Sequence, residues 1–209
     1  MKIGIIGSGR IGATLARLFV GVGHEVAVAN RHTPETLRAL QDELGSALHP
    51  ASVEDAGHFG DIVVVSIPFH TIDQLPAPAL AGKIVVDSNN YYPGRDGNVS
   101  ALDRDETTST ELLAQHLPGA RIVKAFNTMY FVTLAQSGDR AQDEGERLAL
   151  FLAGDDAEAK QAVAGLIDEI GFAPVDTGSL AGGGRRQQPG SDIYNRELTG
   201  AEARQILGP

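Results

Sequence analysis

Residues 2–12 read KIGIIGSGRIG, and this stretch decides the fold. A short apolar run leads directly into Gly7, Gly9 and Gly12, spaced as G-x-G-x-x-G, and apolar residues then recur at helical spacing over 13–22. A strand that passes through such glycines into a helix is typical of dinucleotide-binding domains. Gly7 would permit the tight turn, Gly9 would let the backbone approach a pyrophosphate, and Gly12 would let the helix pack closely on the strand. A strand–helix turn without a ligand is the alternative, and the two flanking elements weigh against it.

Apolar runs and helical patterns alternate along the rest of the chain. Strands are expected at 25–29, 61–67, 83–87, 121–125, 148–153 and 172–176. Helices are expected at 34–44, 108–116 and 156–170, and a short one from Thr199 with Glu202 placed for a capping box. This alternation predicts an α/β fold: a Rossmann-type, doubly wound, mainly parallel sheet of about eight strands.

The chain divides into one large unit and a short tail. Residues 1–180 should form a Rossmann-type domain around one core. The polar segment 91–107 is expected to be a surface loop. Residues 181–209 are too few to form their own core, so we expect this C-terminal tail to pack on the domain or on a partner subunit.

The second expected strand ends in polar residues at a point where many dinucleotide-binding domains carry an acid. Residues 25–33 read EVAVANRHT. A carboxylate here would accept hydrogen bonds from the adenosine ribose and would repel a 2′-phosphate. Arg31 can instead bind a phosphate with two parallel N–H bonds, and Asn30 and Thr33 can each donate another. His32 adds charge when it is protonated. The domain is therefore predicted to bind NADP(H) rather than NAD(H), the alternative being a solvated loop arginine.

Composition argues against several other classes of protein. Hydrophobic residues make up 42% and charged residues 21%, as in soluble globular proteins. The net charge of −10 and the lack of a Lys/Arg run weigh against a nucleic-acid partner. The chain has no cysteine and its six histidines are scattered, so no metal site is predicted. No apolar run is long enough for a signal peptide or a membrane span, so we expect a cytoplasmic protein with no membrane partner.

Longer segments of the chain resemble a known family. The segments occur in the order GIIGSGRIGATLARLFVGVGHEV, ANR, VVVSIPF, VVDSNN, RIVKAFNT and FLAGDDAEAKQAVAGLIDEIGFAPVDTGSL. Together they resemble the NADP oxidoreductases that use the deazaflavin coenzyme F-420. The soluble nucleotide-binding domain of the six-transmembrane metalloreductases is similar too, above all in SNN and VKAFNT. The resemblance covers about residues 1–180.

The resemblance implies roles for individual positions around a bound NADP(H). The pyrophosphate would be lined by the glycine loop, namely Gly7, Ser8, Gly9, Arg10, Ile11 and Gly12, and the 2′-phosphate would be held by Asn30 and Arg31. The ribose and nicotinamide would be bordered by Ser66, Ile67, Pro68, Asn89, Ala125, Phe126 and Asn127. These positions lie at strand ends, where open α/β sheets bind ligands. A turn-forming role is the alternative for Asn89 and for Asn127.

The activity implied by the resemblance is hydride transfer between NADP(H) and coenzyme F-420, two carriers that hold the hydride chemistry themselves. No catalytic residue is assigned, and the candidates for proton transfer or contact with the second substrate are Asn127, Tyr130 and His70. One alternative is an NADPH-dependent reductase of a flavin, quinone, carbonyl compound or ferric chelate. The other is a non-catalytic NADP(H)-binding sensor or regulatory protein.

Two segments depart from the resemblance. One is 130–147, where a second substrate would be covered, and the other is the tail with Arg185 and Arg186. These arginines could attract the phosphate and glutamate tail of coenzyme F-420, or they could be solvated surface charge. A homodimer, with the tail reaching across the interface, is a further expectation.

Overall fold

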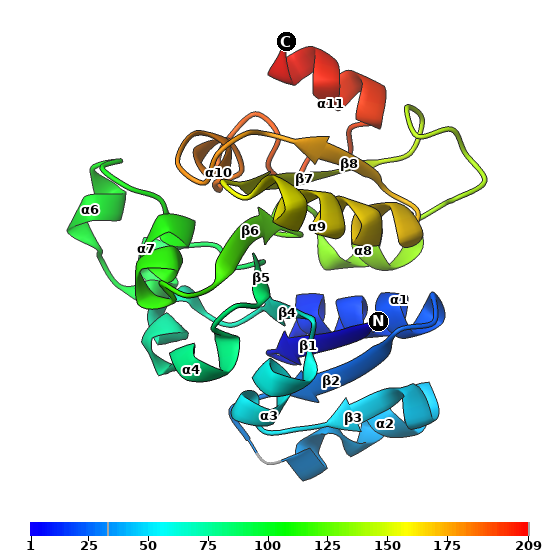
Figure 1. Cartoon of the computed structure of the whole chain (residues 1–209). Coiled ribbons are helices and arrows are strands. Elements are labelled where there is room, and N and C mark those ends of the chain that lie inside the picture. Colours follow the sequence, from blue (N-terminus) through cyan, green and yellow to red (C-terminus); the bar gives the residue numbers. More distant parts are fainter. Residues whose placement is uncertain (33, 209) are drawn as a thin grey trace.

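The computed structural model describes residues 1–32 and 34–208, and within these ranges eight strands form a single sheet (Figure 1). The strands are β1 Lys2–Ile6, β2 Glu25–Ala29, β3 Leu48–Pro50, β4 Ile62–Val65, β5 Ile84–Asp87, β6 Arg121–Ala125, β7 Ala149–Gly154 and β8 Ala173–Asp176. They lie in the order β3-β2-β1-β4-β5-β6-β7-β8, and each neighbouring pair is parallel except β6 and β7. The predicted doubly wound, mainly parallel sheet is confirmed.

The strand that the sequence did not predict is β3, at the edge of the sheet. Its residues Leu48, His49 and Pro50 pair with β2. Three residues are too few to show either an alternating or a continuous apolar pattern. A proline is tolerated here because an edge strand leaves one side without ladder hydrogen bonds.

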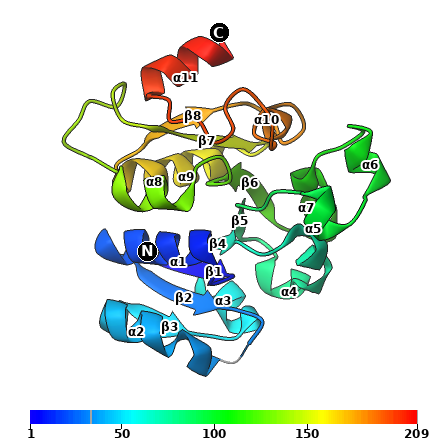
Figure 2. The ribbon, with the colours of Figure 1, turned by 180° about the vertical axis from the view of Figure 1, so that it is seen from behind.

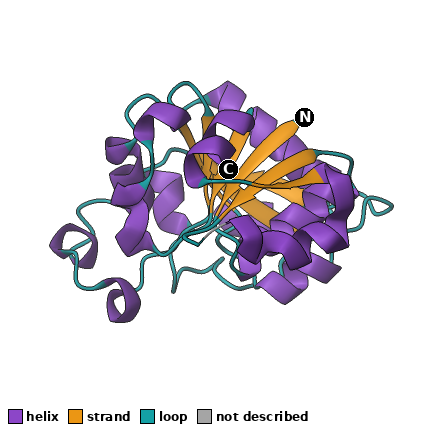
Figure 3. Cartoon of the chain, turned by 90° about the horizontal axis from the view of Figure 1, so that it is seen from below, coloured by secondary structure: helices purple, strands orange, loops and turns teal. Residues whose placement is uncertain are grey.

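Helices cover both faces of the sheet (Figure 3). One face packs against α1 Arg10–Gly21, α2 Arg38–Leu44, α8 Phe131–Gln136 and α9 Ala157–Glu169. The opposite face packs against α3 Val53–Phe59, α4 Ala77–Leu80 and α7 Ser109–His116. Consecutive strand residues point into opposite layers, so Ile5 and Val64 join the first core, and Ile6 and Val65 join the second. Burial on both faces explains why the central strands are almost wholly apolar.

Two stretches of local structure differ from the sequence prediction. The expected loop 91–107 contains two single-turn helices, α5 Pro93–Asp96 and α6 Ser100–Asp103, and a proline at the start of a helix suits the first of them. The expected helix 34–44 is a 3-10 turn over Pro34–Leu37 followed by α2. The phosphate-binding role expected for Thr33 lies outside the described residues.

The tail folds back against the far end of the sheet (Figures 1 and 2). It contains α10 Gly182–Arg186, which lies against β7, and α11 Gly200–Leu207, which lies against β8. The predicted capping box between Thr199 and Glu202 is present at the start of α11. A small separate core forms there from Ala149, Phe151, Val175, Ile193, Leu198 and Ala203. Of the helices in the described residues, none has both the length and the apolar character that crossing a membrane requires.

Candidate functional site

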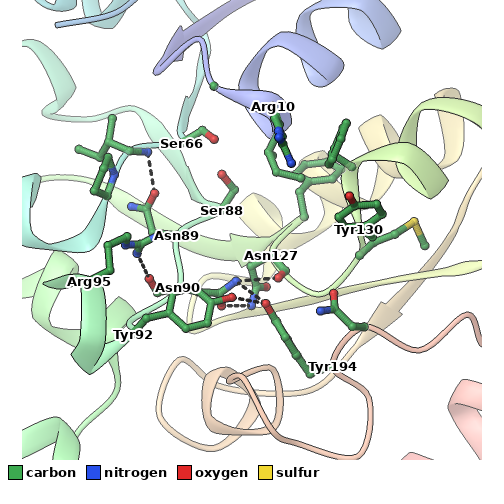
Figure 4. A pocket seen from close by; sticks show the side chains of 18 residues that line it. Arg10, Ser66, Ser88, Asn89, Asn90, Tyr92, Arg95, Asn127, Tyr130 and Tyr194 are labelled. Carbon is green, nitrogen blue, oxygen red and sulfur yellow. Dashed lines mark hydrogen bonds between the residues drawn. The ribbon is translucent and has the colours of Figure 1, made fainter.

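A cavity of about 590 Å³ lies at the carboxyl ends of β1, β4, β5 and β6 (Figure 4). The strand order continues from β1 to β2 and β3 on one side of the sheet, and from β4 to β5 and β6 on the other. Open α/β sheets bind ligands at such a switch point. The lining residues are Gly9, Arg10, Ile11, Ser66, Ile67, Pro68, Ser88, Asn89, Asn90, Tyr92, Arg95, Phe126, Asn127, Met129, Tyr130, Phe131, Tyr194 and Asn195. Most of the residues assigned to the dinucleotide from the sequence therefore meet in one place.

The glycine loop between β1 and α1 has the geometry of a phosphate cradle. Gly7 has φ +114°, and a Cβ on it would lie 2.0 Å from the Ser66 carbonyl oxygen. A Cβ on Gly12 would lie 1.9 Å from the Gly7 oxygen, whereas a Cβ on Gly9 would meet nothing within 4 Å. Only Gly9 therefore faces open space. No side chain caps α1, so its first N–H groups are directed at that space, which suits an anionic pyrophosphate.

At the end of β2, Asn30 and Arg31 make different kinds of contact, a difference that the sequence did not reveal. The two amide hydrogens of Asn30 go to the Ser8 hydroxyl at 3.1 Å and to the Thr36 hydroxyl at 3.0 Å. Its Oδ1 accepts from the His32 N–H at 2.8 Å. Asn30 thus ties the glycine loop to the end of β2, with no hydrogen left over for a phosphate. Arg31 is exposed, its Nε contacts the His32 ring at 3.3 Å, and it forms no ion pair with any described residue. The residues present fit a 2′-phosphate through Arg31.

Asn89 links the ends of β4 and β5 beside the cavity. Its Oδ1 accepts a hydrogen bond from the Ile67 N–H at 2.8 Å, which fixes the orientation of the amide. The side chain is 4% exposed, and its Nδ2 donates to no described residue. Buried amide hydrogens are almost always paired, so this one suits an oxygen of a bound ligand. Asn89 thus connects the two strand ends and keeps one amide group without a described partner beside the cavity.

A buried charge network lies directly behind Asn89. Lys124, the next-to-last residue of β6, is 1% exposed and uses its three N–H donors on the Thr110 hydroxyl at 2.9 Å, the Asn89 carbonyl at 3.1 Å and Asp87 at 3.5 Å. Thr110 in turn donates to Asp87 at 2.5 Å, and the Asn89 N–H donates to the other carboxylate oxygen. The lysine and the aspartate of VVDSNN and RIVKAFNT therefore brace the cavity floor without entering it.

The turn after β6 is held in an unusual backbone conformation. Phe126 is fully buried with φ +63°, a conformation that costs a non-glycine residue about 1–3 kcal/mol. Its ring packs edge-on against Phe19 of α1, with ring centroids 6.2 Å apart. Asn127 follows, and its Nδ2 donates to the Gln187 carbonyl at 2.8 Å and to Asn90 Oδ1 at 3.0 Å. The strained turn thereby brings Asn127 into the cavity wall.

The side of the cavity away from Arg10 is formed by residues that the sequence did not single out (Figure 4). Arg95 lies over the Tyr92 ring at 5.0 Å and donates to the Asn90 carbonyl at 2.6 Å. The hydroxyls of Tyr92 and Tyr194 share a short hydrogen bond. Burial, followed by this hydrogen bond, raises the pKa of the Tyr194 hydroxyl well above its usual range. Tyr92 and Arg95 come from the polar segment 91–107, at and within α5, and Tyr194 comes from the tail, and no periodic pattern marks them.

Four further residues singled out from the sequence, on the surface or in the core, do not line the cavity. His70 is on the surface, where its Nδ1 lies 2.9 Å from Asp96. Ala125 is buried in β6 and supports the turn from behind. Arg185 and Arg186 bind Asp105 and the Leu207 carbonyl, away from the cavity. Of the candidates for contact with the second substrate, Asn127 and Tyr130 line the cavity, and Tyr130 is 54% exposed at the rim.

The doubly wound sheet, the glycine loop at its switch point and the adjoining cavity define a nicotinamide dinucleotide-dependent oxidoreductase domain. The family model described as NADP oxidoreductase, coenzyme F420-dependent, matches residues 2–91. A solved hypothetical protein from Sinorhizobium meliloti is 32% identical, with a TM-score of 0.83 and coverage of 95% of both chains. The chain belongs to this family of NADP oxidoreductases.

Two further relatives differ in the acceptor that their names suggest. A candidate F420-dependent NADP reductase from Arthrobacter sp. FB24 is 27% identical, covers 95% of this chain and 99% of that chain, and has a TM-score of 0.76. Metalloreductase STEAP3 of Rattus norvegicus is 34% identical over 182 residues, which is 86% of this chain and 34% of the relative. The chain thus spans about a third of the length of the curated relatives it matches.

Proposed function

We propose that this protein transfers a hydride between NADP(H) and the deazaflavin coenzyme F-420. The observation that carries the proposal is the two-sided cavity, with an anion-binding glycine loop at one end and an aromatic wall at the other. Such a shape suits two planar carriers placed face to face. The family and the Arthrobacter relative support the deazaflavin as the second carrier.

In this reaction the protein would bind the two carriers, align their rings and shield them from water. Bound NADPH would supply the hydride. The glycine loop and the start of α1 would hold its pyrophosphate, Arg31 its 2′-phosphate, and Asn89 an oxygen of its ribose or carboxamide. Tyr92, Tyr130 and Tyr194 would form the wall against which the acceptor ring lies. Reacting carbons about 3–3.5 Å apart and the exclusion of water would provide most of the rate enhancement.

The proposed step balances without a side-chain acid. Bound NADPH would supply the hydride from nicotinamide C4 to C5 of the deazaflavin, and ring nitrogen N1 would take its proton from solvent. Reduction of an isolated carbonyl compound would instead need a positioned proton donor. Tyr130 is largely exposed, and the raised pKa of Tyr194 makes it a weak acid, so the described lining favours a ring acceptor.

A flavin-dependent ferric reductase activity is the second candidate, because the 34% identical relative is a metalloreductase. The two are separated by mixing the purified protein and NADPH with coenzyme F-420, with FMN, and with a ferric chelate in the presence and absence of FMN. Loss of NADPH absorbance only with the deazaflavin is the expected result. Turnover restricted to FMN and the chelate would replace the proposal by the second candidate, and tight NADPH binding without any turnover would indicate a sensor.

A further inference from the structure

A small polar cluster on the tail side of the cavity has hydrogen-bonding capacity that the protein itself does not use. It consists of Asn90, Tyr92, Asn127 and Tyr194 (Figure 4). Asn90 is its hub, because its Nδ2 donates to the Asn127 carbonyl at 2.8 Å and to the Tyr194 hydroxyl at 3.4 Å, while its Oδ1 accepts from Asn127. The cluster connects the loops after β5 and β6 to the tail.

The two tyrosines have one hydroxyl hydrogen that the bond between them does not use. Tyr92 and Tyr194 carry two hydroxyl hydrogens, and one of them forms the hydrogen bond between the two oxygens. Asn90 contributes only hydrogens to Tyr194, because an amide nitrogen does not accept. Whichever tyrosine donates within the pair, the other keeps its hydrogen. Since both line the cavity, this hydrogen is available to a bound acceptor oxygen.

Asn127 has an acceptor oxygen that receives no hydrogen bond from the described residues. Its Nδ2 is identified by the bond to the Gln187 carbonyl, which can only accept, so the other amide atom is the oxygen. The side chain is 5% exposed, and no donor among the described residues reaches this Oδ1. An unpaired buried carbonyl oxygen is unfavourable, and an N–H group of a ligand would satisfy it.

We infer that this cluster holds the acceptor ring by an imide edge. Asn127 Oδ1 accepts the ring N–H, and the spare hydroxyl hydrogen of the Tyr92–Tyr194 pair donates to the neighbouring ring carbonyl. Asn90 bonds to both groups and so sets donor and acceptor beside each other, as an N–H next to a C=O requires. Deazaflavins and flavins share this edge, so the inference rests on a ring acceptor, as in the proposed function, and not on which of the two rings it is.

The tail is part of this recognition. Gln187 orients the Asn127 amide, and the Asn195 N–H, bound to the Thr128 carbonyl at 2.8 Å, fixes the segment that carries Tyr194. Asn127 is therefore a residue that determines specificity, and Gln187 is a positioning residue that acts through it.

The test compares lumiflavin with 3-methyllumiflavin, in which a methyl group replaces the hydrogen of the imide. Binding is followed by ring fluorescence with the full chain saturated with NADP⁺, so that no turnover is needed. The unmodified protein should bind the methylated ring about tenfold more weakly, the effect of one lost hydrogen bond to a buried group. The variant N127A should bind both rings with equal, weaker affinity. The double variant Y92F/Y194F, which removes both hydroxyl hydrogens, should weaken both rings yet keep the preference between them.

A matched control is available in the adjacent residue. The Tyr91 hydroxyl shares its one hydrogen between Asp103 and the Gly97 carbonyl outside the cavity, so Y91F should leave both affinities unchanged. Equal binding of the two rings by the unmodified protein would overturn the inference, as would a failure to bind either ring. If N127A instead weakened NADP⁺ and left the rings unaffected, the nicotinamide carboxamide would be the group recognised and the inference would be wrong. Ring binding with the predicted preference but no hydride transfer would refute the proposed function alone.

Discussion

Replacing Lys124 with methionine should destabilise the protein severely, because its charge is paired entirely inside the fold. The ammonium group and the Asp87 carboxylate are 1% and 2% exposed and 3.5 Å apart. Removing one member of a buried pair leaves the other charge without compensation, a loss of about 3–5 kcal/mol. In a chain of this length each kcal/mol lowers the melting temperature by about 2–4 °C, so K124M should melt about 6–20 °C below the unmodified protein.

The assay is urea unfolding followed by circular dichroism, with thermal melts alongside. K160M is the matched control, because Lys160 pairs with Asp176 at 2.7 Å at the surface and should contribute only about 0–1 kcal/mol. The double variant K124M/D87N removes both buried charges, and the new amide can still form hydrogen bonds with the Thr110 hydroxyl and the Asn89 N–H. It should therefore be more stable than K124M. The reasoning fails if K124M loses no more stability than K160M, or if the double variant is the less stable of the two.

Three other predictions concern the cofactor and the surface. Arg31→Glu should raise the dissociation constant for NADPH about tenfold or more and change that for NADH little, as measured by calorimetry. R140E is an exposed, charge-matched control. Equal changes for both cofactors would contradict the phosphate role. Gly12→Ala should abolish measurable NADPH binding and lower stability, because its Cβ would lie 1.9 Å from the Gly7 oxygen. Burial acts to raise the pKa of Asp96, but hydrogen bonds from Arg95, the Tyr92 N–H and His70 outweigh it and hold that pKa well below its usual range. Its stabilisation is therefore present above the unfolded pKa near 3.8 and lost as pH falls, so D96N should be less stable at pH 7 and approach the unmodified protein in acid unfolding curves.

The nucleotide half of the fold was predictable because its signals are local in the chain. Gly7, Gly9 and Gly12 follow a strand and open a helix, and the parallel strands place their ends at one edge. Asn30 shows the limit of such reasoning, because position alone cannot tell that its amide hydrogens are used within the protein. The buried role of Lys124 was open to prediction, since a lysine inside an apolar run needs a partner and Asp87 ends the neighbouring strand.

The opposite half of the site was not predictable, because it depends on contacts between distant segments. Tyr92 and Tyr194 are 102 positions apart, and each stands in a polar stretch with no periodic pattern. Nothing in the sequence indicates that the tail returns to the turn after β6, where Asn127 meets Gln187. Tertiary packing alone decides which of the chain's tyrosines face the cavity.

The reversal of direction between β6 and β7 separates the last two strands from the sheet edge that carries the cavity. Because β7 runs antiparallel, the carboxyl ends of β7 and β8 point away from the edge formed by the parallel strands, and the chain must cross back to reach it. The returning segment touches that edge through contacts such as the one between Asn127 and Gln187, and its apolar side chains pack on β7 and β8. Exchanging this segment would therefore alter the wall that Tyr194 and Asn195 contribute and leave the glycine loop and the end of β2 in place.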